Sequence, residues 1–160
     1  MTPYRVVYEA FLARITADEW TLEDDLHIVE RDWEQLLDMA VFRFKYPRVS
    51  LAPTICQCHC DPDMPPCPPQ KAFQGDLDDG EIQLLALYMK HEWIKRCIAS
   101  WENIRMLYSS KDFSQANFLA KLVELEKNVA LEVHKAEGIY DRSRHKRPAD
   151  KFKKLAGKNV

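Results

Sequence analysis

Glycine is scarce in this sequence, with 4 residues among 160. So few glycines argue against a β fold built on many tight turns. No apolar run approaches the roughly 20 residues that a transmembrane helix needs. The N-terminal stretch MTPYRVVYEAFLARI lacks the basic start and the small-residue cleavage site of a secretory signal. We therefore expect no membrane contact and a cytosolic setting in which thiols stay reduced.

The motifs of common enzyme classes are also absent. The chain has no glycine-rich phosphate loop, no G-x-S-x-G and no H-E-x-x-H. His91 and Glu92 fall in the middle of a predicted helix, with no acid–base partner at a recognisable spacing, so we expect His91 to be a solvated or capped helix residue. The sequence predicts no catalytic residue and no enzyme activity.

What is present is helical periodicity over most of a chain long enough for one domain. It predicts four main helices. The first follows Thr2 as N-cap and Pro3 at the first helical position, and the second ends before Pro47. The third runs from an acidic cluster at residues 76–81 to Tyr108, and the fourth is capped by Ser114. Their stripes predict a buried set of Phe11, Leu36, Leu37, Leu85, Met89, Trp101, Leu122 and Leu125.

The predicted fold class is all-α, a helical bundle with a long Cys/Pro-rich loop and an extended basic C-terminal tail. Residues 1–141 form the expected body, with the loop 50–80 inserted, and residues 142–160 form the tail. The tail carries eight Lys/Arg against one acidic residue, a net charge of +7, which leaves the body at −9. Its basic and apolar residues are candidates for docking on a partner: Arg142, Arg144, Lys146, Arg147, Lys151, Phe152, Lys153, Lys154 and Leu155.

The stretch CQCHCDPDMPPCPP, residues 56–69, holds four of the five cysteines and five of the nine prolines. Cys56, Cys58, Cys60 and Cys67, with His59 nearby, supply enough soft ligands for a tetrahedral zinc. The C-x-C-H-C spacing matches no common zinc knuckle, however, and neighbouring cysteines at i, i+2 bridge each other poorly. An unliganded reduced loop, a zinc site and a disulfide stay open, in that order of preference, and no other cofactor is indicated.

Two segments resemble the small α-helical neck proteins of tailed bacteriophages, the head–tail adaptor or head-completion family. The first is RFKYPRVSL at 43–51, which closes a helix. The second is IASWENIRMLYSSKDFSQANFLAKLVELE at 98–126, which joins two helices, and a basic KLAG follows at 154–157. The Cys/Pro-rich loop departs from the family pattern, which has a shorter acidic linker there.

The resemblance implies a structural virion protein assembled in the host bacterial cytoplasm. Its subunits would form a ring, expected to be a dodecamer, between the portal protein and the tail or neck proteins below, with DNA passing through without sequence-specific binding. An acidic body suits such a channel, because like charges do not adhere to phosphate. The alternative is a nucleic-acid-binding regulatory protein that uses the basic tail, with or without a zinc loop.

Overall fold

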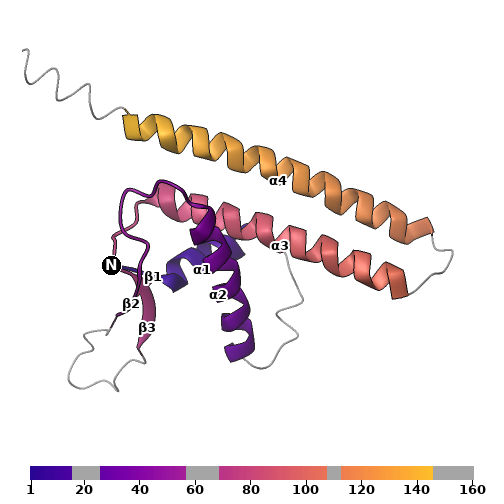
Figure 1. Ribbon diagram of the computed structural model, residues 1–160, viewed down its shortest axis with the longest axis horizontal. Coiled ribbons are helices and arrows are strands. Elements are labelled where there is room, and N and C mark those ends of the chain that lie inside the picture. Colours follow the sequence, from indigo (N-terminus) through magenta and orange to yellow (C-terminus); the bar gives the residue numbers. More distant parts are fainter. Residues whose placement is uncertain (16–25, 57–68, 108–112, 146–160) are drawn as a thin grey trace, which may run out of the picture.

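The computed structural model describes residues 1–15, 26–56, 69–107 and 113–145. Four helices dominate it: α1 (Tyr4–Leu12), α2 (Leu26–Arg43), α3 (Asp79–Leu107) and α4 (Phe113–His145). The long helices α3 and α4 lie side by side, and α1 and α2 pack on the other side of α3 (Figure 1). The predicted helical bundle is therefore confirmed in its main elements, with α3 as the central helix.

A small sheet is the part of the fold that the sequence did not predict. Three strands, β1 (Thr2–Pro3), β2 (Pro53–Cys56) and β3 (Gln70–Phe73), pair antiparallel in the order β1-β3-β2. Two of them lie within 50–80, which we expected to be an irregular loop. The strands have at most four residues, too few for a period-two pattern to be distinguished from loop sequence.

The sheet also changes the role of Thr2, which does not cap α1. Thr2 belongs to β1, and Pro3 occupies the N-cap position without a side-chain cap. The Thr2 hydroxyl instead accepts a hydrogen bond of 2.8 Å from the Leu77 N–H, just before α3. This bond ties the N-terminus to the start of the central helix, 75 residues away in sequence.

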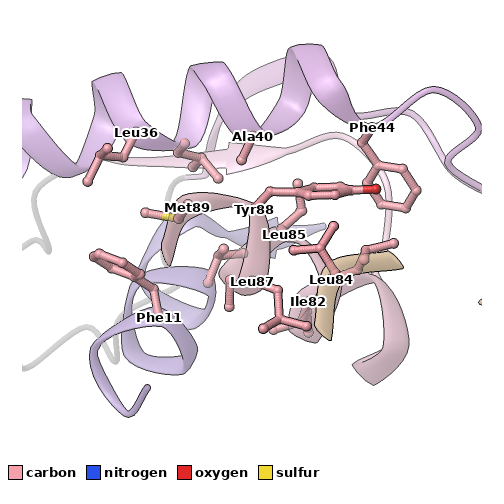
Figure 2. Packing of buried hydrophobic residues seen from close by; sticks show 14 of the residues in the cluster. Phe11, Leu36, Ala40, Phe44, Ile82, Leu84, Leu85, Leu87, Tyr88 and Met89 are labelled. Atoms are coloured by element: carbon pink, nitrogen blue, oxygen red, sulfur yellow. The ribbon is translucent and has the colours of Figure 1, made fainter. Parts of the chain in front are cut away.

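The core forms around the first three turns of α3. Seven of the eight residues from Ile82 to Met89 are buried, which is expected of a helix surrounded by other elements. Phe11 from α1 contacts this segment on one side, and Leu36, Ala40 and Phe44 at α2 contact it on another (Figure 2). Beneath the sheet, Tyr4 packs against Phe73 with ring centroids 4.5 Å apart.

The predicted buried set is right in α1, in α2 and in the first half of α3, and wrong near the end of α3 and on α4. Phe11, Leu36, Leu37, Leu85 and Met89 are buried as expected. Trp101 and Leu122 are only half-buried, and Leu125 is exposed. The reason is that α4 packs mainly on α3, so only a narrow stripe of its apolar residues is covered.

Two glycines provide opposite tests of this packing. A Cβ at Gly75 would lie 2.5 Å from Val49 Cγ2 and 2.8 Å from the Ser50 carbonyl oxygen, whereas a Cβ at Gly138, inside α4, would meet nothing within 4 Å. We expect Gly75→Ala to lower the free energy of unfolding by about 1–3 kcal/mol through overpacking. Gly138→Ala should raise it by about 0.5–1 kcal/mol through helix propensity. Urea titrations of both variants check this pair, and a destabilised Gly138→Ala would contradict it.

Candidate functional site

A buried carboxylate joins the start of α3 to two distant segments. Glu81 is 1% exposed. Its Oε1 accepts hydrogen bonds of 2.8 Å from the Arg48 N–H and of 2.8 Å from the Tyr140 hydroxyl. Its Oε2 accepts one of 3.2 Å from the Asp78 N–H, while Asp78 Oδ1 accepts one of 2.9 Å from the Glu81 N–H. This reciprocal pair is a capping box. Because Glu81 also bonds to Tyr140, the first turn of α3 is connected to the end of α4.

The side chain of Arg48 closes the same junction from outside. Its guanidinium forms an ion pair with Asp78 and lies over the Tyr140 ring, 5.0 Å from the centroid. It also donates to the Ser143 hydroxyl at 2.5 Å. The segment after α2, the start of α3 and the last turns of α4 are therefore held at one end of the molecule.

A second polar cluster lies further along α3. His91 was expected to be a solvated or capped helix residue, and its burial shows that the solvated alternative is wrong. Its Nδ1 contacts the Arg43 guanidinium, and its Nε2 lies 2.7 Å from Glu126 Oε1. Arginine offers no acceptor, so Nδ1 accepts and Nε2–H donates to the carboxylate. With both ring nitrogens occupied, His91 connects α2, α3 and α4 as a structural residue.

Between the two clusters is a shallow pocket of about 320 Å³. Tyr88 and Tyr140 line it, with Arg43 and Lys45 as cations and Glu137 and Asp141 as anions. Arg43 lies 4.9 Å from the centroid of the Tyr88 ring, and the Tyr88 hydroxyl donates to Glu137 at 2.8 Å. Tyr88, Glu137 and Arg43 are thus engaged with one another, and the Tyr140 hydroxyl donates to Glu81, so the phenols of the pocket are already used by the fold.

The two tyrosines make the fold sensitive to alkali. Burial, followed by the hydrogen bond to Glu137 or Glu81, raises the pKa of Tyr88 and of Tyr140 well above the ordinary value of 10.0. The native state therefore keeps protons that the unfolded chain loses, and the free energy of unfolding should fall as pH rises above about 10. We expect these phenols to ionise only as helical structure is lost, followed by phenolate absorbance and circular dichroism. Complete ionisation of all six tyrosines with the helices intact would contradict this.

An acidic groove of about 430 Å³ lies between α2 and the sheet. Glu34 and Asp38 line its helical side, and Lys71, which pairs with Glu34, is the single basic residue among those lining it. Its other walls are mainly apolar: Tyr4, Val41, Leu51, Pro53, Thr54 and Ile55. Burial, followed by the negative charge of the neighbouring Glu34, raises the pKa of the Asp38 carboxyl, while Lys71 acts in the opposite direction.

Several large apolar side chains of α4 remain exposed to solvent among the polar residues of its surface. Of its described side chains, only Val129, Val133 and Tyr140 are buried. The exposed apolar ones are Leu125, Leu131 (57%) and Ile139 (61%), whereas the partly exposed Phe118 ring packs on Trp101 of α3 with the centroids 4.9 Å apart. Next to Phe118, a shallow apolar depression is lined by Leu119, Ala120, Val123, Glu124 and Lys127. This face is available for packing against another protein.

The predicted docking tail begins inside α4. The helix extends to His145, five residues beyond the end of the apolar stripe at Tyr140, and the exposed Arg142 donates from Nε to the Gly138 carbonyl at 2.9 Å. Arg144 is also part of the helix. The other docking candidates lie outside the described residues: Lys146, Arg147, Lys151, Phe152, Lys153, Lys154 and Leu155.

The cysteine-rich segment connects the two strands of a hairpin. Cys56 is the last residue of β2 and has a free thiol, and β3 begins at Gln70, its partner across the ladder. Cys58, His59, Cys60 and Cys67 lie outside the described residues. Among the residues that are described, no three Cys, His, Asp or Glu side chains gather as a metal site.

We expect serine at Cys56, Cys58, Cys60 and Cys67 together to leave the helical body folded. Cys56 is outside the core cluster, and the other three fall between β2 and β3 in the sequence and outside every helical segment. The thermal unfolding curve of this variant should match that of the parent chain by circular dichroism. Stoichiometric zinc in the purified protein, together with unfolding of the helices by a chelator, would show that a metal supports the structure instead.

Comparison with known proteins adds no relative. No protein-family model matches this chain, and neither a curated protein nor a solved structure matches it. Within the described ranges, no helix combines the length and apolar content of a membrane-spanning segment.

Proposed function

We propose that this chain is a structural subunit of a tailed-phage neck, which assembles with copies of itself into a ring on the portal and lines the DNA channel. The observation that supports it best is the exposed apolar face of α4. A helix of 33 residues that buries so few of its described side chains is expected where neighbouring subunits complete the packing. The segment WENIRMLYSSKDFSQANFL, which carries part of the resemblance, contains the first residues of this helix.

The polar clusters support an architectural role. Glu81, Arg48 and His91 are bonded to residues from other elements, so they stabilise one arrangement of the helices. Bonds of this kind keep the helices in a fixed arrangement, as a structural subunit requires. The proposed partners are the portal protein, the tail or neck proteins below it, and other copies of this chain.

The test is assembly of the purified chain with the portal protein of the phage that encodes it, as the proposal requires. Sedimentation and electron microscopy should show a ring of this chain bound at one end of the portal. Leu131→Lys and Ile139→Lys, which place charge on the exposed face of α4, should abolish the ring and preserve the helical signal of the monomer. No binding to the portal, together with binding to duplex DNA that weakens steeply with salt, would favour the regulatory alternative.

A further inference from the structure

We propose that the acidic groove between α2 and the sheet is the binding site for this chain's own C-terminal segment, residues 146–160. The segment contains Lys151-Phe152-Lys153-Lys154-Leu155, in which three cations accompany two apolar side chains. The groove offers the complementary surface, with carboxylates on one side and apolar walls on the other. The proposal depends on this chain alone and holds whether or not the neck assembly exists.

The charge arrangement on α2 is the first argument. Glu30, Glu34 and Asp38 repeat every four residues and so share one face of the helix, where like charges at that spacing are destabilising. Lys71 is the single cation that reaches this row from the groove lining, and it pairs with Glu34. The phenol of Tyr4 also has a raised pKa, from burial and then from Asp38 and Glu34. The groove therefore carries an excess of negative charge that cations would relieve.

The apolar wall is the second argument. Ile55 on β2 is 65% exposed, and it faces Lys71 across the ladder, so both lie on the face of the sheet that lines the groove. Val41 on α2 and Leu51 and Pro53 before and in β2 extend the apolar lining of the groove. An occupant with both cations and large apolar side chains fits this surface better than a purely basic peptide.

The position of the chain end is the third argument. The end of α4 is fixed beside the segment that leads into the groove, because Arg48 bonds to Ser143 and Leu51 follows three residues later. That end of α4 and the sheet lie at the same end of the molecule (Figure 1). Six residues, from Lys146 to Lys151, can span up to about 20 Å. The basic segment therefore has the reach to enter the groove of its own molecule.

Limited trypsin digestion of the full chain tests this docking. Cleavage at Lys151, Lys153 and Lys154 should be slow in the parent chain, because the protease attacks only the undocked segment. The groove variant Glu34→Gln/Asp38→Asn should speed this cleavage about tenfold or more, as should high salt. The control Glu124→Gln/Glu132→Gln removes the same charge from α4 and should leave the rate unchanged.

The dependence of the cleavage rate on protein concentration shows whether the groove holds the segment of its own molecule or that of a second copy. Docking within one molecule predicts cleavage rates that do not depend on concentration. Protection that increases with concentration would place the segment in the groove of a second copy and overturn the proposal. Cleavage as fast as that of a free peptide of residues 146–160, or protection unchanged by the groove variant, would also overturn it. Binding to the portal is a separate measurement, so the docking proposal and the neck proposal can each be refuted independently of the other.

Discussion

Glu81→Ala should lower the free energy of unfolding by about 3 kcal/mol or more. The substitution removes the acceptor of the part-buried Arg48 and Asp78 N–H groups and one of the two acceptors of the buried Tyr140 hydroxyl, which keeps the Tyr46 carbonyl at 3.3 Å. Each unsatisfied buried donor costs about 1–3 kcal/mol, and partial access of water to the junction keeps the sum toward the lower end. Chemical denaturation monitored by helical circular dichroism measures the change.

Two variants make this prediction specific to the junction. Glu132→Ala removes an exposed glutamate from α4 and should change stability by no more than about 0.5 kcal/mol. Tyr140→Phe removes one donor to Glu81 and should cost about 1–2 kcal/mol. Because the two residues share a bond, Glu81→Ala and Tyr140→Phe should be non-additive when combined. A Glu81→Ala loss no larger than that of Glu132→Ala would contradict the role given to the carboxylate.

Leu85→Ala should have the second large effect, a loss of about 2–5 kcal/mol. Leu85 is completely buried in the segment of α3 that α1 and α2 enclose (Figure 2), so truncation leaves a cavity. Leu131→Ala is the matched control, since that leucine lies on the exposed face of α4, and its change should stay within about 0.5 kcal/mol. Equal losses from both leucines in the monomer would mean that α4 is covered in a way this structure does not show.

The helices were predictable because their apolar periodicity is long. The second and third predicted helices match α2 and α3 closely, and Pro47 ended the second as expected. The sheet was not predictable, since β1 has two residues and pairs with β3 some 70 residues later. Such a pairing is set by tertiary contacts, which local pattern does not contain.

The polar clusters show a second limit of the sequence. The pair Asp78 and Glu81 has the D-x-x-E spacing of a capping box, and that signal was available. Its extension to Arg48 and Tyr140 was not, because it depends on how α4 returns along α3. The same is true of the acidic groove. The i, i+4 spacing of the α2 carboxylates can be recognised in the sequence, whereas the apolar residues of β2 that line the other side of the groove are brought there by the fold.

The end of α4 at His145 determines where the predicted tail can be removed without damage to the helix. Removal of residues 142–160 would cut into α4 and delete Ser143, which bonds to Arg48. Truncation after His145 keeps the helix whole and removes only the segment beyond it. That boundary separates loss of docking from loss of fold.

The most direct measurement of the neck assignment is DNA retention by phage heads that were assembled without this chain and then incubated with it. The heads come from a phage genome in which this gene is inactivated, and retained DNA is quantified after nuclease treatment. We predict that the full chain restores retention and that the chain ending at His145 does not. Heads that keep their DNA without this chain, or that lose it equally after the full chain is added, would contradict the assignment.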